Sequence, residues 1–284
     1  MIKPQTITEE LMFVTARLES VVGNKVIGTG TGFFYNHNVK SEPGKQIPLL
    51  VTNKHVVQGA DKVRLLMHKA KKEENSFTVN GYYTVDLLGS WQEHPDGLDL
   101  VAYSIAGVLR EVEEKQDSVY KINIVGKIIP TSADEEDFSA VEDILMIGYP
   151  NGLWDSTNNL PIFRKGITAT HPAVDFRGAP EFVIDAACFP GSSGSPVFLV
   201  NQGAFASKSS KSLKLGTRFF FLGVLYSGPV LNSKGEIVVE EVPTSQKPVA
   251  VMKNMLNLGF VIKSKEVVKL AEHIEDIVTK SAPK

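Results

Sequence analysis

The chain has 284 residues, of which 43% are hydrophobic and 22% are charged, and its formal net charge is -2. This length corresponds to one large domain or two smaller ones, either with a sizeable core, and the composition is ordinary for a soluble globular protein. The nearly balanced charge gives no bulk electrostatic reason to bind nucleic acid or an anionic membrane, so we expect neither as a partner.

The cysteine content and the N-terminal residues bear on the cellular compartment. Only one cysteine, Cys188, is present, so no intramolecular disulfide can form. The first residues include Glu9 and Glu10 and lack the long apolar core of a signal peptide. The longest apolar run elsewhere, 219–226, is too short to span a bilayer as a helix. We therefore predict a cytoplasmic protein, although a secreted chain whose signal had been removed would fit as well.

Short β-strands account for most of the sequence. Segments rich in Val, Phe, Tyr and Leu alternate with clusters of Gly, Pro, Asn and Asp. In the first half, strands are expected at 26–35, 47–53, 62–68, 77–88 and 99–105. In the second half, they are expected at 143–149, 182–188, 195–200, 218–226 and 236–242. Many short strands separated by turns indicate a sandwich or barrels.

Three other segments have a different pattern. Residues 106–140 separate the two halves and contain a short helical stretch followed by acidic, turn-rich sequence, so we place a domain boundary there. The polar and basic segment 201–217 is typical of a surface hairpin. At the C-terminus, apolar residues recur at three-four spacing and predict an amphipathic helix with Ser264 as its N-cap. Its apolar stripe should pack on the protein's own core, with docking of a partner as the alternative.

A cluster of serines, "FPGSSGSP" (189–196), lies between two apolar segments. A flexible Gly-Ser linker would stay polar on both sides, whereas "FVIDAAC" precedes this cluster and "PVFLV" follows it. A tight turn between buried strands is a constrained backbone that can present one serine as a nucleophile. Such a serine needs a base, an acid that orients the base, and N–H donors for the developing oxyanion.

His55 is the best candidate for the base. It follows the apolar segment "LLVTN" and precedes a short apolar turn, which places its ring at a strand end with one side buried. The remaining histidines lie in turns, beside a basic run, before a proline or on the C-terminal helix. We expect these to be surface or structural residues: His37, His68, His94, His171 and His273.

The segment "HPDGLDLVAYSI" offers two acids. Asp96 lies between Pro95 and Gly97 in an evident turn, so it should be solvated. Asp99 lies between two leucines at the start of an expected buried strand. A buried carboxylate is costly unless it has a partner, and an imidazole N–H would supply one. We therefore predict that Asp99 orients His55.

A base, an acid and a nucleophile in this chain order make the sequence similar to the chymotrypsin-like (trypsin-like) serine peptidases. Four stretches carry the resemblance: "GTGTGFFY" (28–35), "VTNKHVV" (51–57), "LDLVAY" (98–103) and "GSSGSP" (191–196). Each is weak alone, whereas all four in order are specific, and with 221–228 they cover most of the chain. The sequence resembles most the bacterial HtrA-like members, without a recognisable PDZ domain.

The resemblance assigns roles to individual residues. The family pattern G-x-S-G-[GS]-P aligns with 191–196, which makes Ser193 the nucleophile and leaves Ser192 at the variable position. It implies His55 as the base, Asp99 as the orienting acid and Ser193 as the attacking group of a serine endopeptidase. The oxyanion donors would be the backbone N–H groups of Gly191 and Ser193.

Two positions depart from the secreted members of this family. Their activation uses an acid just before the nucleophile, whereas the residue here is Ser192, so we expect activity without N-terminal processing. The residue six before the nucleophile forms the base of the specificity pocket, and here it is Ala187. With a wall expected at Tyr226, Ser227 and Gly228, the resemblance favours a small or medium apolar residue before the scissile bond.

The expected fold is all-β, with two packed antiparallel six-stranded β-barrels and a C-terminal α-helix. Residues 1–115 would form the barrel that carries the base and the acid. Residues 116–262 would form the barrel that carries the nucleophile, and 263–284 the helix and tail.

The alternatives to a serine peptidase are a binding module and another hydrolase fold. A trypsin-like fold with an idle triad could act as a protein-binding module. The α/β-hydrolase elbow fails because Ser195 replaces its final glycine, a strand follows, and the base comes first in the chain. We expect a protein or peptide substrate and no cofactor. We also expect no metal, since no His/Cys/Asp group has metal-ligand spacing. Whether the protein has a regulatory partner or forms a homo-oligomer stays open.

Overall fold

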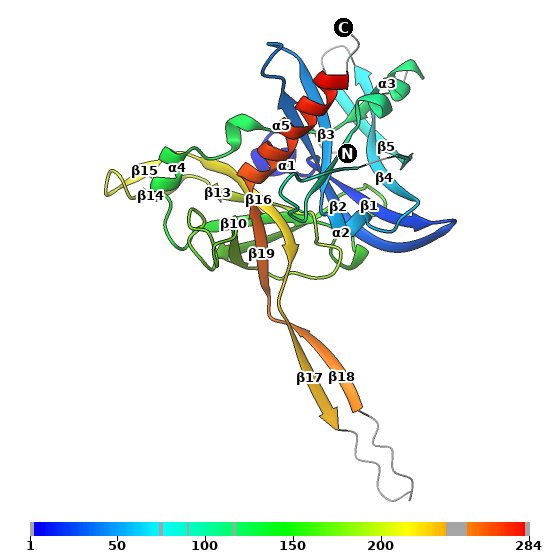
Figure 1. The fold of residues 1–284 in the computed structure, drawn as a ribbon. Helices are drawn as coiled ribbons and strands as arrows, with labels where there is room; N and C mark the ends of the chain where they lie inside the picture. Colours follow the sequence, from blue (N-terminus) through cyan, green and yellow to red (C-terminus); the bar gives the residue numbers. More distant parts are fainter. Residues whose placement is uncertain (1–2, 74–75, 90, 116–117, 237–248, 282–284) are drawn as a thin grey trace, which may run out of the picture.

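The computed structural model describes residues 3–73, 76–89, 91–115, 118–236 and 249–281. Each half of the chain forms one β-structure, and a long C-terminal helix packs against both (Figure 1). A two-stranded arm extends away from this body (Figure 1). The architecture confirms the expected all-β fold with a C-terminal helix.

The N-terminal half forms a sheet of nine strands in the order β5-β4-β1-β2-β3-β7-β6, with β8 paired to β4 and β9 to β2. The strands are β1 (Thr15–Val22), β2 (Lys25–Asn38), β3 (Gln46–Thr52), β4 (Lys62–Glu73), β5 (Ser76–Leu87), β6 (Gln92–Glu93), β7 (Val101–Ser104), β8 (Ser118–Tyr120) and β9 (Ile124–Val125). The pairings of β8 and β9 extend this sheet past the expected boundary at residue 115. These short strands also make it larger than the six strands expected.

The C-terminal half forms a closed six-stranded barrel in the order β10-β11-β12-β19-β16-β13. Its strands are β10 (Asp143–Gly148), β11 (Ile162–Thr168), β12 (Glu181–Asp185), β13 (Pro196–Asn201), β16 (Arg218–Ser227) and β19 (Leu258–Lys263). Neighbouring strands pair antiparallel throughout the barrel. This barrel confirms the expectation for the second half.

Two hairpins project from the barrel. β14 (Ala204–Ser207) and β15 (Ser212–Leu215) form the surface hairpin expected within 201–217. β17 (Val230–Glu236) and β18 (Val249–Met255) form the arm. The strand expected at 236–242 lies outside the described residues except for its first position.

Helices are few and mostly short. They are α1 (Ile7–Leu11), α2 (Lys54–Val57), α3 (Ala106–Glu114), α4 (Ser132–Glu136) and α5 (Ser264–Ser281), with 3-10 turns at Gly126–Ile128 and Pro150–Gly152. The long helix α5 begins at Ser264, so the residue expected as the N-cap is instead the first residue of the helix. No helix in the described part of the chain is long and apolar enough to cross a membrane.

One hydrophobic core joins the two β-structures. Phe33 of β2 and Phe221 of β16 are fully buried, and their ring centroids lie 5.4 Å apart. The apolar stripe of α5 completes this core through four buried residues, Val267, Leu270, Ala271 and Ile274. Burial of a large apolar side chain stabilises the fold by about 1.5–3 kcal/mol. The C-terminal helix therefore packs on the protein's own core, as the three-four spacing predicts.

Candidate active site

His55 lies on α2, immediately after β3. An added Cβ at Gly30 of β2 would overlap the side chain of Val56, so the glycine lets this helix pack closely on the sheet. Asn53 precedes the helix but does not cap it with its side chain. Its buried amide instead donates to the backbone oxygen of Asp99 at 2.7 Å. Asn53 thus ties the segment that carries the base to the segment that carries the acid.

Two hydrogen bonds join His55 to Asp99. The ring Nδ1 lies 2.6 Å from Oδ2, and the backbone N–H of His55 donates to Oδ1 at 3.0 Å. Because a carboxylate accepts hydrogen bonds, the proton resides on Nδ1 and leaves Nε2 as a free base. The side chains are 47% and 27% exposed, so Asp99 is less buried than its position between two leucines suggested. Hydrogen bonds with His55 and Asn53, and not deep burial, hold Asp99 in position before β7.

Hydrogen bonding in the serine turn leaves two backbone N–H groups free. The N–H of Ser192 donates to Phe189 O at 3.0 Å, that of Gly194 to Leu225 O at 2.8 Å, and that of Ser195 to Ser192 O at 3.0 Å. Within the described residues, the N–H groups of Gly191 and Ser193 have no acceptor. Since backbone donors are nearly always paired, two unpaired donors flanking one residue indicate a site for an anionic oxygen.

Glycine is required at two positions of this turn. Gly191 and Gly194 have φ of +87° and +86°, a region that residues with a side chain rarely adopt. An added Cβ at Gly191 would lie 2.6 Å from the backbone oxygen of Tyr149. An added Cβ at Gly194 would overlap the Thr31 oxygen and lie 2.6 Å from Thr52 Oγ1. The turn is therefore pressed against both β-structures.

Thr31 of β2 holds the serine turn against the N-terminal sheet. Its N–H donates to Ser193 O at 2.9 Å, and its hydroxyl donates to Gly191 O at 3.0 Å. Its backbone oxygen accepts from Thr52 Oγ1 at 2.7 Å. Thr52 ends β3, directly before the segment that carries His55. Ser193 is thus fixed through Thr31 to the strand that leads to the base.

No hydrogen bond between the Ser193 hydroxyl and the His55 ring occurs within the described residues. Ser193 is partly exposed and His55 is exposed, so both side chains are accessible from solvent. Hydrogen bonds of this kind are often long in a free enzyme and tighten when substrate binds. The arrangement provides an oriented imidazole, a constrained serine and two free N–H donors, which is the chemistry of acyl transfer.

The residues expected to form the specificity pocket lie at the ends of two strands. Ala187 follows β12 and is half-buried, while Tyr226 and Ser227 end β16. The Tyr226 hydroxyl donates to the carboxylate of Glu181, a residue that the sequence did not single out. Burial, together with this carboxylate, raises the pKa of Tyr226 above its usual range. Gly228 follows β16 directly and is half-buried.

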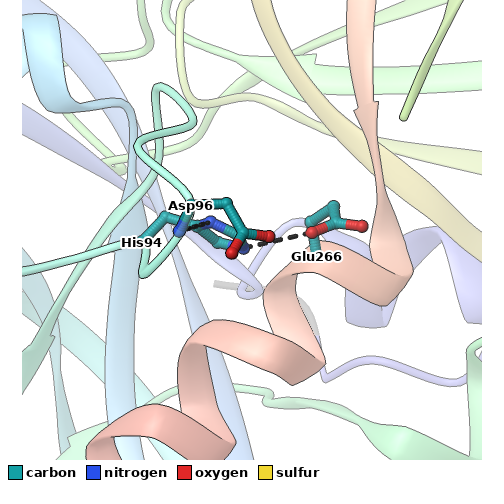
Figure 2. A group of neighbouring side chains, drawn as sticks. All are labelled: His94, Asp96 and Glu266. Atoms are coloured by element: carbon teal, nitrogen blue, oxygen red, sulfur yellow. Dashed lines mark hydrogen bonds and ion pairs between the residues drawn. The ribbon is translucent and has the colours of Figure 1, made fainter. Parts of the chain in front are cut away.

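Three groups that could bind a metal ion meet near the acid: His94, Asp96 and Glu266 (Figure 2). Their ligand atoms lie within 4.8 Å of one another, although the sequence separates Glu266 from the other two. The Asp96 N–H donates to His94 Nδ1 at 3.2 Å, so Nε2 carries the proton and faces Glu266 at 3.2 Å. The Lys269 ammonium already supplies a cation to Asp96. The cluster therefore ties α5 to the turn before Asp99.

Other histidines are structural, as expected. His37 lies 2.7 Å from Glu275 of α5 in a buried pair. His68 packs edge-on against Phe13, with ring centroids 4.9 Å apart. His68 is 3% exposed, so the basic run that follows it did not indicate a surface position.

The family model of the trypsin-like peptidase domain matches residues 30–206. The chain belongs to this family. The match contains the oriented imidazole, its acid and the constrained serine turn. No curated protein sequence matches the chain.

Two solved structures resemble the trypsin-like chain. One is Rv3671c from M. tuberculosis H37Rv in an inactive form, which is 14% identical, with 95% of this chain and 89% of that chain covered and a TM-score of 0.42. The other is the serine endoprotease from Yersinia pestis, which is also 14% identical, with 97% and 68% covered and a TM-score of 0.49.

Proposed function

We propose that this trypsin-like chain is an active serine endopeptidase. The observation that carries the proposal is the pair of hydrogen bonds from His55 to Asp99, because they fix the tautomer in which Nε2 can accept a proton. The serine turn with its two unpaired N–H groups supports the same chemistry. Such groups depend on one another for activity, so their joint presence argues for a working site.

In the proposed reaction, Ser193 Oγ attacks a peptide carbonyl carbon while His55 Nε2 takes its proton. Asp99 holds the ring and stabilises the imidazolium. The N–H groups of Gly191 and Ser193 stabilise the negative oxygen of the tetrahedral intermediate. The imidazolium then protonates the leaving amine, and water, deprotonated by the same ring, hydrolyses the acyl-enzyme.

The residue before the scissile bond would be small or medium and apolar. Ala187 offers no counter-charge at the expected pocket base, and the nearby Glu181 carboxylate accepts the Tyr226 hydroxyl. A peptide-library profile dominated by Arg or Lys at this position would contradict the expectation.

A fluorophosphonate probe tests the proposal, since it reacts with activated serines and does not label an idle scaffold. We expect wild-type protein to be labelled, with mass spectrometry locating the probe on Ser193. Ser193→Ala and His55→Ala should abolish labelling. Ser192→Ala is the matched control because it removes a neighbouring hydroxyl and should leave labelling in place. Full labelling of Ser193→Ala would refute the mechanism, and an unlabelled wild type would favour the binding-module alternative.

A further inference from the structure

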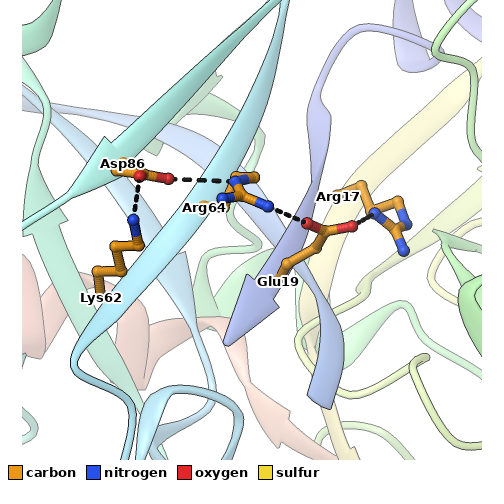
Figure 3. A network of polar contacts seen from close by, with 5 residues as sticks. All are labelled: Arg17, Glu19, Lys62, Arg64 and Asp86. Atoms are coloured by element: carbon orange, nitrogen blue, oxygen red, sulfur yellow. Dashed lines mark hydrogen bonds and ion pairs between the residues drawn. The ribbon is translucent and has the colours of Figure 1, made fainter. Parts of the chain in front are cut away.

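A row of charged side chains crosses the outer face of β1, β4 and β5 (Figure 3). Glu19 lies opposite Arg64 in the ladder, and Arg64 lies opposite Asp86. Arg64 bridges these two acids at 3.3 and 3.2 Å, and Lys62 reaches Asp86 at 2.6 Å. At one end of the row, Arg17 pairs with Glu19 and has a side chain that is only 12% exposed. The row therefore holds the Arg17 side chain in place on the sheet.

The loop 149–161, which joins β10 to β11 in the other half of the molecule, lies against this end of the row. The Arg17 guanidinium lies over the ring of Trp154, 5.2 Å from its centroid. The ring of Tyr82 on β5 meets Trp154 edge-on, with the centroids 5.8 Å apart. A cation over an indole face and an edge-on aromatic pair are both attractive contacts. Trp154 thus attaches the loop to the N-terminal sheet.

The loop forms a tight turn at 149–153, immediately before Trp154. Backbone hydrogen bonds of 3.1 and 2.7 Å close this turn. An added Cβ at Gly152 would lie 3.7 Å from Arg17 Nη2, so the turn lies beside the same guanidinium. Only one residue, Leu153, separates Gly152 from the ring. A displacement of the ring would therefore move the turn as well.

The peptide unit between Pro190 and Gly191 is oriented by this turn. The N–H of Asn151 donates to Pro190 O. In a trans peptide the C=O and the N–H lie in one plane and point in opposite directions, so this bond directs the Gly191 N–H away from the loop. That N–H is one of the two unpaired donors of the serine turn. The loop also fills the space behind Gly191, where an added Cβ would lie 2.6 Å from Tyr149 O and 3.1 Å from Asn151 N.

We propose that Trp154 is a positioning residue for the oxyanion donor: its contact with Arg17 holds the loop against the serine turn and keeps the Gly191 N–H directed at the oxyanion. A glycine restricts its own backbone less than any other residue, so the restriction must come from its surroundings. The inference rests on the proposed peptidase function. Loosening the loop should weaken binding of the transition state and leave binding of the substrate unchanged.

The test measures the rate and the final extent of fluorophosphonate labelling, because the phosphoryl oxygen of the probe uses the same donors as a peptide oxyanion. Trp154→Leu removes the ring, whereas Trp154→Phe keeps a ring under Arg17. Loss of a whole donor costs on the order of 100-fold, so a displaced donor should slow labelling by Trp154→Leu roughly tenfold. Trp154→Phe should restore most of the rate. Labelling should still reach completion in both variants, since every site is intact.

Peptide cleavage gives a second readout. In Trp154→Leu, kcat should fall by about the same factor as the labelling rate, with KM unchanged. The pH at which kcat/KM is half-maximal should also stay the same, because the loop acts on the Gly191 N–H and not on the imidazole of His55. Tyr82→Leu removes one of the two contacts of the Trp154 ring and should slow both reactions by a smaller factor.

Phe205→Leu is the matched control. Phe205 also lies under an arginine, with Arg218 5.0 Å from its ring centroid, but the length of β13 separates it from the serine turn. Its loss should leave the labelling rate unchanged. An unchanged rate in Trp154→Leu, even with a reduced final extent, would overturn the inference, as would a Trp154→Phe variant as slow as Trp154→Leu. A wild type that is not labelled at all would instead sink the proposed function.

Discussion

Gly194 occupies a position where even a methyl group has no room. Its backbone has a positive φ, and an added Cβ would meet oxygen atoms of Thr31 and Thr52. Both threonines belong to the sheet that leads to the base. The absence of a side chain at Gly194 is thus what allows the serine turn to reach the opposite half of the molecule.

Replacing Gly194 by alanine should lower the free energy of unfolding by clearly more than the 1–2 kcal/mol or so that a left-handed backbone alone costs. Gly203→Ala is the matched control, because Gly203 has φ of +90° and open space around an added Cβ. Urea denaturation of both variants measures the difference. Equal losses would show that backbone strain, not the contact with Thr31, decides the need for glycine.

The sequence identifies the candidate residues better than their bonding. His55, Asp99 and Ser193 could be named because each lies in a short motif with a distinct local context. The unpaired N–H groups could not be predicted, since they depend on where neighbouring donors find acceptors. The N–H of Gly194, for example, is taken by Leu225, a residue far away in sequence.

At the scale of elements, helix α5 contacts the turn that precedes Asp99. His94 is fully buried in this contact and faces Glu266, while Asp96 and Lys269 form an ion pair at its exposed edge. Burial lowers the pKa of His94, so its ring is neutral, and its buried Nε2 lies 3.2 Å from the carboxylate without forming a hydrogen bond to it.

Glu266→Ala should therefore destabilise the protein by about 1–3 kcal/mol, because it removes the carboxylate that lies 3.2 Å from the buried polar Nε2 of His94. Lys269→Ala, one turn further along α5, makes a matched control: its ion pair with Asp96 is about half exposed and screened by water, so its loss should cost less. Chemical denaturation at neutral pH compares the two. A larger loss for Lys269→Ala would contradict this account.

Most strands with a strong apolar pattern could be predicted, although the apolar barrel strand β19 was missed, and strands with mixed patterns such as β1 and β11 were missed as well. β1 places Arg17 and Glu19 on its outer face, and β11 carries Arg164 and Lys165, so both contain fewer apolar residues than their neighbours. Their strand character comes from pairing with adjacent strands. The short helical stretch expected within 106–140 is α3, which begins at Ala106 because only one residue separates it from β7.

At the scale of the molecule, acid should weaken the fold before its carboxylates titrate. Burial lowers the pKa of His68 from 6.5 to about 4, with contacts to the backbone of Asn158 and Asn159 acting weakly in the opposite direction. The unfolded chain binds a proton near pH 6.5, whereas the folded protein does not until about pH 4. Stability from this group is therefore fully present above pH 6.5 and declines toward pH 4.

Between pH 6.5 and 5, the free energy of unfolding should fall by up to about 1.4 kcal/mol per pH unit for this histidine. The buried His94 adds to the decline in the same direction. Urea denaturation at several pH values measures how the free energy of unfolding depends on pH. His68→Gln should reduce this slope by about the contribution of one proton. An unchanged slope in the variant would exclude His68 as its source.

The charged row on the outer sheet could not be read from the sequence. Its members come from β1, β4 and β5, and only the register of three strands brings Glu19, Arg64 and Asp86 into line. Trp154 joins them from the other half of the chain. Such a surface depends on contacts between distant segments, which local patterns do not encode.

Thr31 imposes a condition on recombining this protein with its relatives. Its hydroxyl donates to Gly191 O and accepts from Tyr149 N–H and the Ser195 hydroxyl, which uses its full hydrogen-bonding capacity across the junction. A chimera that took its N-terminal sheet from another trypsin-like protein would need a hydroxyl at this one position to shape the serine turn. The two halves are thus not freely exchangeable modules, even though each is a β-structure of its own.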